Sequence, residues 1–144
     1  MDLLSIAISI FIVLETLNII LLYFSPSSKK GNGVGVFNTY EKSKESPEIH
    51  RFIKYLINWV AGTKLIFILL LIVIIITGTQ TTKLLTVGAL ILSILSFYWR
   101  LYPAIREMDS EGEITPRGYS KTLFIMITVF IAVFAGTLVI TLFF

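Results

Sequence analysis

The chain has 144 residues, of which 56% are apolar and only 15% are charged, and its formal net charge is +3. This composition and a mean hydropathy of +0.87 do not fit an ordinary soluble domain. The length suits one domain, and the apolar segments leave no room for a separate soluble catalytic module. The absence of cysteine excludes disulfides, thiolate nucleophiles and Cys-bound metal, and the single histidine, His50, excludes a His-based metal cluster within one chain. We therefore expect no cofactor and no metal site.

Four apolar segments are long enough to cross a hydrocarbon core of about 30 Å, which takes about 20 helical residues. They cover residues 3–24, 56–77, 82–102 and 120–143, and Pro or Gly closely follows the first three. The first segment has neither a preceding basic residue nor a small-residue cleavage pattern, so we expect a retained helix and not a secretory signal. Residues 65–76 are apolar without a break, whereas strands of a membrane barrel alternate in polarity. The predicted fold is an all-α, four-helix transmembrane bundle, with residues 1–144 as one integral membrane domain.

Basic residues are unevenly distributed among the connectors. Those on or beside the first connector are Lys29, Lys30, Lys42, Lys44, Arg51 and Lys54, and those on the third are Arg100, Arg106, Arg117 and Lys121. The opposite side has only Lys83. Because basic residues in short loops favour the cytoplasmic side, we expect a multi-pass protein of a cell membrane with the first and third connectors in the cytoplasm and both termini outside.

The segment before the second span has a helical pattern of its own. Ser46, Pro47 and Glu48 are typical of a helix start, and apolar residues then follow the helical repeat. The pattern predicts an amphipathic helical extension, either lying on or entering the cytoplasmic leaflet, or continuing the second span as a solvated extension. Its basic residues indicate membrane lipids, and not nucleic acid, as partners.

Two opposite charges fall inside predicted spans. Glu15 and Lys64 lie at a similar distance from the cytoplasmic ends of the first two spans, and an unpaired ion at that depth costs several kcal/mol. We predict an ion pair between them, with Asn18 one turn from Glu15 on the same face. The pair has either a structural role or a role as a binding or proton site.

The last two spans carry stripes of small or hydroxylated residues. In the third, Thr86, Ala89, Ser93, Ser96 and Arg100 share one face. This stripe predicts either close helix packing or a wetted, ligand-contacting groove with Arg100 at its mouth. In the fourth, Thr128, Ala132 and Gly136 repeat at four, which favours close packing within the bundle or between subunits, and we expect self-association.

The connectors carry weaker signals. Closely spaced glycines follow Lys29 and Lys30, but the strand and helix of a phosphate-binding loop are missing, so we expect a flexible loop near headgroups. The acidic residues of the third connector predict a solvated loop, with a divalent cation site as the less favoured interpretation. Ser120 is the expected cap of the last helix.

The topology, with four spans and a long first cytoplasmic connector, resembles the trimeric membrane glutathione-metabolising family known as MAPEG. Arg100, Arg117 and Tyr119 are similar in placement to arginines and a tyrosine of that family. The His-Asn-Glu signature that enters its second helix is not reproduced by residues 48–51 and Asn58. The resemblance implies a membrane-embedded enzyme acting on a lipophilic or anionic substrate in a cytoplasmic-side cleft at Arg117 and Tyr119.

Three classes of function follow from these patterns. Ionisable residues inside spans favour an oligomeric transporter or channel. Its binding residues would be Glu15, Asn18, Lys64, Ser93, Ser96 and Arg100. The alternatives are the MAPEG-like enzyme and an accessory subunit of a membrane complex, and the lack of a nucleophile-and-base arrangement or a cofactor motif makes an enzyme the less favoured of these classes.

Overall fold

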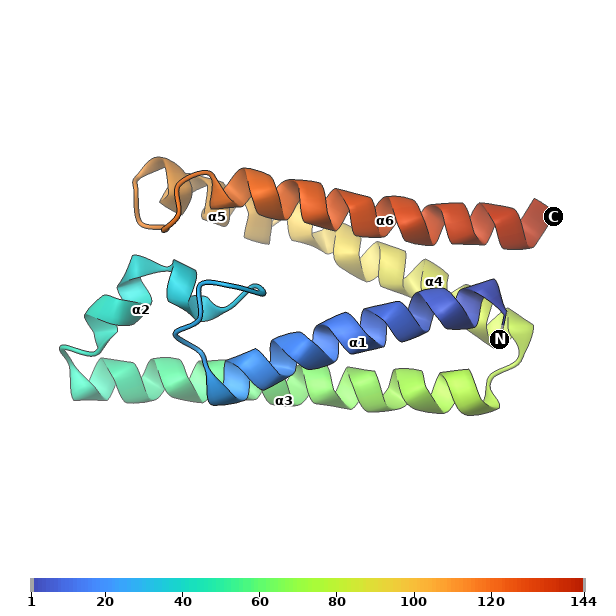
Figure 1. The fold of residues 1–144 in the computed structure, drawn as a ribbon, viewed down its shortest axis with the longest axis horizontal. Helices are drawn as coiled ribbons and strands as arrows, with labels where there is room; N and C mark the ends of the chain where they lie inside the picture. The colour runs from blue at the N-terminus through green and yellow to red at the C-terminus, as the bar shows by residue number, and fades with distance from the viewer. Residues whose placement is uncertain (1, 144) are drawn as a thin grey trace.

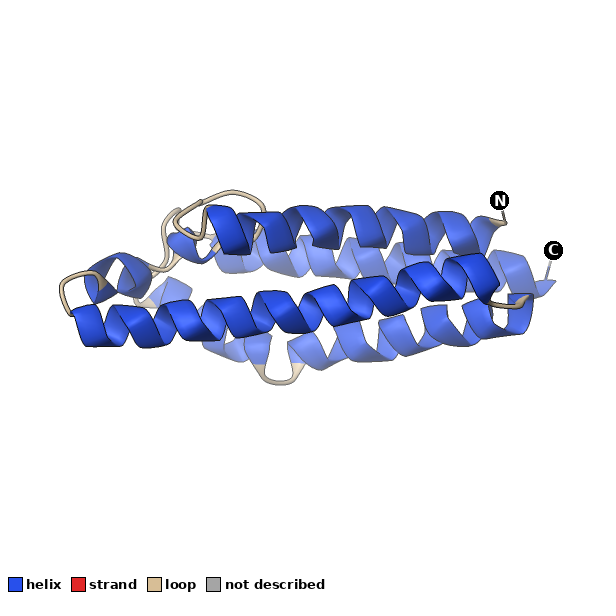
Figure 2. Ribbon diagram, turned by 90° about the horizontal axis from the view of Figure 1, so that it is seen from below, coloured by secondary structure: helices blue, strands red, loops and turns tan. Residues whose placement is uncertain are grey.

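The computed structural model describes residues 2–143, and that part of the chain is helical apart from its turns and connectors. Four long helices run side by side: α1 (Leu3–Phe24), α3 (Pro47–Thr77), α4 (Gln80–Leu95) and α6 (Tyr119–Phe143) (Figures 1 and 2). The shorter α2 (Asn38–Ser43) and α5 (Leu101–Ser110) lie at one end, with 3-10 turns η1 (Val34–Val36) and η2 (Ser96–Tyr98). The predicted all-helical fold is confirmed, and it contains four helical segments long and apolar enough to cross a membrane.

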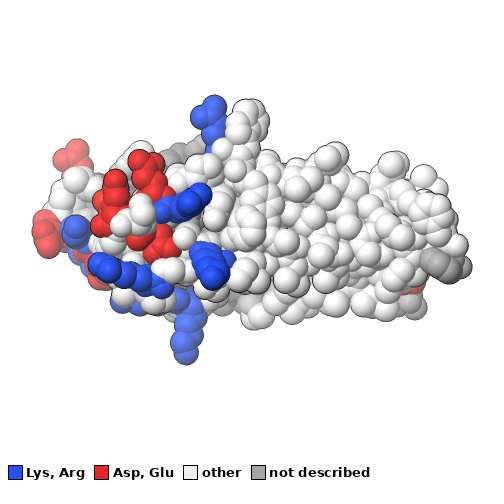
Figure 3. All heavy atoms as spheres, turned by 90° about the horizontal axis from the view of Figure 1, so that it is seen from above, with Lys and Arg blue, Asp and Glu red and all other residues white. Residues whose placement is uncertain are grey.

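The two ends of the bundle differ in charge. Both chain ends lie at the same end of the bundle (Figures 1 and 2), because an even number of long helical segments returns the chain to the end where it began. The connectors 25–46 and 96–118 lie at the other end, which we call the charged end. Lys, Arg, Asp and Glu side chains gather there, while the rest of the visible face is almost free of charge (Figure 3).

Helix α1 holds the bundle together, because it contacts α3, α4 and α6. Toward the chain termini its Leu4 and Ile8 are fully buried against residues of all three partners, including Phe134. The Phe11 ring meets Phe134 edge-on at 5.8 Å. Large apolar side chains cover the outer surface of all four long helices, as lipid-facing surfaces require.

Helix α3 is one continuous helix of 31 residues, so the predicted amphipathic segment and the second predicted span belong to the same helix. Ser46 occupies the N-cap position without a side-chain capping bond, and Pro47 begins the helix. Proline is well suited there because its missing N–H would have no partner within the helix.

The third predicted span, 82–102, is not one unbroken helix. Helix α4 ends at Leu95, the 3-10 turn follows, and α5 begins at Leu101. Pro103 therefore does not end a helix; it lies in the first turn of α5, where no intrahelical N–H bond is lost. Ile105, buried at 4% exposure, fixes α5 against the bundle.

The two connectors at the charged end are joined to each other. A β-bridge links Phe37 to Ile114, and the backbone N–H of Thr115 donates to the carbonyl of Val36 at 2.8 Å. The Asn38 N–H donates to the carbonyl of Glu113, also at 2.8 Å. Val36 and Ile114 are almost fully buried. The two connectors are therefore joined into a cap on the bundle, while the acidic side chains of Glu107, Glu111 and Glu113 are exposed, as the sequence predicts.

The start of α6 is capped from α5 and not by Ser120 as expected. Asp109 accepts the N–H of Gly118 at 2.9 Å and that of Ser120 at 3.0 Å. The hydroxyl of Ser120 also donates to Asp109, at 2.5 Å. A carboxylate at this position satisfies donors that the helix leaves unpaired.

Replacing Asp109 by Ala should destabilise the protein by about 1–2 kcal/mol, because the first turn of α6 loses its acceptor. Thermal unfolding in detergent measures the effect, and Glu107→Ala, which removes an exposed acid two residues away on the same helix, is the control. Equal unfolding temperatures for the two variants would contradict the assigned cap.

At the opposite end, Asp2 caps α1 and binds Lys83, which follows the turn between α3 and α4. Asp2 accepts the Ser5 N–H at 2.8 Å and the Lys83 ammonium at 2.8 Å. The hydrogen bond from Lys83, followed by that from the Ser5 backbone, holds the pKa of Asp2 far below its usual 3.8. The contact ties the start of α1 to the α3–α4 turn.

This contact predicts an acid-dependent loss of stability. Because the folded-state pKa of Asp2 is lowered, its contribution is fully present above the unfolded pKa of about 3.9 and is lost as pH falls below that value. The unfolding temperature of Asp2→Asn should therefore fall less below about pH 4 than that of the unaltered protein. The difference in unfolding temperature between the two proteins should be smaller at pH 3 than at pH 7. An unchanged difference between the two proteins at pH 7 and pH 3 would contradict the assignment.

Candidate functional site

The predicted ion pair between α1 and α3 is confirmed. The Lys64 ammonium nitrogen lies 2.6 Å from a carboxylate oxygen of Glu15 and 2.6 Å from the side-chain oxygen of Asn18. The side chains of Lys64 and Glu15 are 30% and 29% exposed. The pair is therefore shielded on most sides but is not sealed inside the protein.

Asn18 connects this pair to the first connector. It is 7% exposed, and its side-chain nitrogen donates to the carbonyls of Gly31 at 2.7 Å and Asn32 at 3.2 Å. Asn18 lies six residues before the end of α1, so the connector folds back about 9 Å along the helix. Irregular backbone thus lies beside Asn18, one turn of α1 from Glu15.

Local sequence explains how the connector enters this narrow space. Gly31 and Asn32 both have positive φ, at 61° and 60°, a conformation that Gly and Asn adopt most readily. A Cβ atom at Gly35 would collide with the backbone carbonyl of Ser27. The glycines therefore allow two backbone segments to approach closely. The sequence also suggested a phosphate-binding loop, but here the carbonyl oxygens of residues 31 and 32 are directed at Asn18.

Tyr119 links the same connector to α6. Its hydroxyl donates to the side-chain oxygen of Asn32 at 2.8 Å. We call the connected set Glu15, Asn18, Lys64, Asn32 and Tyr119 the polar lock. It joins α1, α3, the first connector and α6.

Sequence analysis identified four members of the polar lock but missed Asn32. The one available signal was the sequence Gly31-Asn32-Gly33, which is typical of backbone with positive φ. That signal indicates a turn but gives no information on which side chain the turn meets. Tyr119 was expected in a different cleft, so its contact with Asn32 was missed too.

The polar lock brings together oxygen acceptors around a single cation. Glu15 and Asn18 hold the Lys64 ammonium, and the adjacent carbonyls of residues 31 and 32 are held by Asn18. Such oxygens are also ligands for a hydrated or bare monovalent cation, and a carboxylate is an acceptor for a proton.

The stripe on the third span lies elsewhere. Ser93, Ser96 and Arg100 are exposed on the outer surface, and the Ser96 hydroxyl donates to the backbone of Ser93 at 2.6 Å. The Arg100 guanidinium lies 5.4 Å from the centre of the Trp99 ring. These three residues neither pack within the bundle nor join the polar lock, so within one chain they form no groove with it.

The small residues of α6 also face outward. Ala132 and Gly136 are exposed, and a Cβ at Gly136 would meet no atom within 4 Å. Thr128 is exposed too, and its hydroxyl is 2.7 Å from that of Tyr98. Of the two interpretations of this stripe, close packing within the bundle is wrong.

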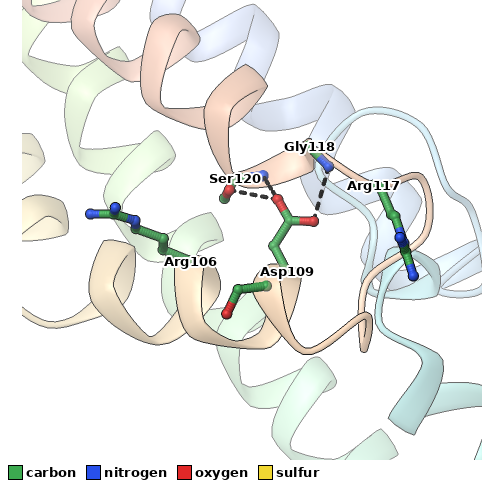
Figure 4. A pocket seen from close by; sticks show the side chains of 6 residues that line it. Arg106, Asp109, Arg117, Gly118 and Ser120 are labelled. Carbon is green, nitrogen blue, oxygen red and sulfur yellow. Dashed lines mark hydrogen bonds between the residues drawn. The ribbon is translucent and has the colours of Figure 1, made fainter.

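A shallow hollow of about 270 Å³ lies at the junction of α5 and α6 (Figure 4). Asp109 points toward the start of α6, whereas Arg106 and Arg117 point away from it on opposite sides (Figure 4). Because Asp109 already accepts from the N–H groups at this helix start, the hollow offers them to no other anion.

The three residues that are similar to MAPEG positions are directed to different partners. Tyr119 bonds to Asn32, Arg100 lies over Trp99, and Arg117 lies at the hollow of Figure 4.

Across residues 2–143, no three His, Cys, Asp or Glu side chains are grouped as metal ligands. Comparison of the chain with protein families, curated proteins and solved structures finds no match.

Replacing Glu15 by Gln should destabilise the protein by about 1–3 kcal/mol, because Lys64 keeps its charge but loses its counterion. The value lies below that for a fully buried pair because both side chains are partly exposed. The double variant Glu15→Gln/Lys64→Met should recover part of the loss, since it removes the uncompensated charge. The measurement is thermal unfolding in detergent, with Glu41→Gln, which disrupts an exposed pair with Lys44, as control; additive effects of the two replacements at the polar lock would contradict the coupling.

Proposed function

We propose that this chain is a small multi-pass membrane protein that conducts or transports a monovalent cation or protons, with Glu15, Asn18 and Lys64 as its binding site. The observation that carries the proposal is the contact of Lys64 with both Glu15 and Asn18 between two helices long enough to cross a bilayer. Ionisable residues at such depth are costly and most often serve ion or proton pathways. In this proposal the Lys64 ammonium competes with the transported cation for the same oxygens.

The first connector supports this proposal from a second direction. Non-helical backbone at membrane depth is tolerated where protein buries it or where it lines a cavity, and carbonyls of such segments coordinate ions in transporters. The carbonyls of Gly31 and Asn32, two exposed residues, accept from the buried Asn18 side chain, and we propose that they lie beside the ion path. We propose that the connector closes the site toward the charged end, which we place in the cytoplasm because of its basic residues.

Self-association is part of the proposal. Ser93 and Ser96 near the end of α4, and Gly136 on α6, are small residues exposed on the outer surface, where a second copy could make close contact. Ser93, Ser96 and Arg100 then contribute to a pathway at the interface of copies and not within one chain. An enzyme in a cleft of Arg100, Arg117 and Tyr119 has less support, because these side chains are directed to separate partners.

Purified protein in liposomes should carry a monovalent cation or proton flux that Glu15→Gln reduces at least tenfold, because the site loses its charged acceptor. A pH-sensitive dye inside the liposomes detects proton flux, and a potassium- or sodium-sensitive dye detects cation flux. Tyr119→Phe should instead raise the flux, because it removes the bond from α6 that holds the connector over the site.

Glu41→Gln is the control for both variants. Equal flux in liposomes with and without protein would overturn the proposed function.

A further inference from the structure

One face of α3 at the charged end is uncovered. Phe52, Tyr55 and Trp59 are 61%, 60% and 64% exposed, and consecutive rings stack with centres 6.4 Å apart. We call these three residues the aromatic face of α3. The other side of the same turns is covered by α2, where the buried Tyr40 ring packs on His50.

The length of α3 places this face relative to a bilayer. Its 31 residues extend about 46 Å, against a hydrocarbon core of about 30 Å. Counted from Thr77, the hydrocarbon ends near Ile57, so Trp59 lies at its boundary. Tyr55 and Phe52 lie about 3 Å and 8 Å beyond, which is the depth of the headgroup layer.

Charges along α3 change sign with distance from the hydrocarbon. Lys54 and Arg51 lie about 5 Å and 9 Å beyond Ile57, still within or next to the headgroups, whereas Glu48 lies about 14 Å beyond. Lys54 and Arg51 are exposed and form no ion pair with another described residue. On the face seen in Figure 3, most Lys and Arg side chains likewise lie between the uncharged zone and the acidic tip.

We propose that the aromatic face of α3, with Arg51 and Lys54, binds the headgroups of anionic phospholipids in the leaflet at the charged end. The basic side chains pair with lipid phosphate and carboxylate groups, and the amphipathic rings of Tyr55 and Trp59 lie at the boundary of headgroup and acyl chain. Glu48 lies beyond the reach of the headgroups and is not repelled by them. The proposal rests on the bundle crossing a bilayer and not on transport.

A second copy of the chain fits this face less well. In a two-fold symmetric contact through the aromatic face, the same patch meets itself, so Arg51, which lies beside Tyr55 on the helix, would lie near Arg51 of the other copy. Lys54 lies farther around the helix, where its exposed side chain can still reach headgroups. Like charges brought together in this way oppose association, whereas an anionic lipid surface attracts all of them. The charge of the patch therefore favours lipid as the occupant.

The chain has two tryptophans, so Trp99→Phe leaves Trp59 as the only indole reporter. In proteoliposomes, brominated lipids quench Trp59 fluorescence on contact, and matched anionic and neutral brominated lipids give the relative binding constant. Each basic residue near an anionic surface contributes on the order of fivefold in binding. We expect a preference for the anionic lipid of several-fold or more, which Arg51→Gln/Lys54→Gln brings close to one.

The control is Lys42→Gln/Lys44→Gln, which removes the same charge from α2, on the other side of α3, and should keep the preference. Helical circular dichroism in the same liposomes tests that each variant is folded.

Equal quenching by anionic and neutral lipid in the parent protein would overturn the proposal. An equal loss of the anionic preference in both double variants would also overturn it. If neither lipid quenches Trp59 at high protein density but both do so once the protein is diluted in lipid, a second copy is the occupant and the proposal is overturned. A lack of ion flux with an intact anionic preference would overturn only the transport function.

Discussion

The pairing of Lys64 with Glu15 is the constraint on which the rest of this structure depends. Each ion alone inside the apolar bundle is costly, so the two helices that carry them must align at one depth. This alignment brings Asn18 beside the same ammonium, where its side-chain oxygen accepts a second bond. The amide nitrogen is then directed at the connector, so one electrostatic requirement also positions a loop.

The first connector also needs hydrogen-bond partners for its own backbone, and these partners link further segments at the charged end. A chain that folds back along α1 must provide partners for its carbonyls, and Asn18 supplies one for residues 31 and 32. Further along, Val36 and Ile114 pair and are buried, which attaches the first connector to the third. The third connector ends in the Asp109 cap of α6. The charged end is thus held together by contacts between segments far apart in the chain.

Features that depend only on the length of a segment, or on the position of a residue along a helix, could be predicted from the sequence. Four apolar runs predict four helices because bilayer thickness fixes their length, and a simple count of residues from each helix end was enough to pair Glu15 with Lys64. Sequence reasoning failed where partners are set by tertiary packing: Asn32 meeting Tyr119 depends on a fold-back that no period encodes. The break after Leu95 was missed for the same reason, since Pro103 resembles a helix end in sequence but is tolerated in the first turn of α5.

If the proposed transport function holds, Lys64 serves both as the counterion of Glu15 and as the occupant of the empty transport site. An ammonium on a flexible stem holds Glu15 and Asn18 in place when no other cation is present, so the empty site carries no uncompensated charge. A cation that enters must displace Lys64, and the partial exposure of the pair leaves the stem a path to extend toward the headgroups. Because Asn18 contacts both Lys64 and the connector, this displacement alters the bonds that keep the connector over the site. In the proposed transporter, occupancy of the site and closure of the charged end would therefore be coupled through the Asn18 side chain.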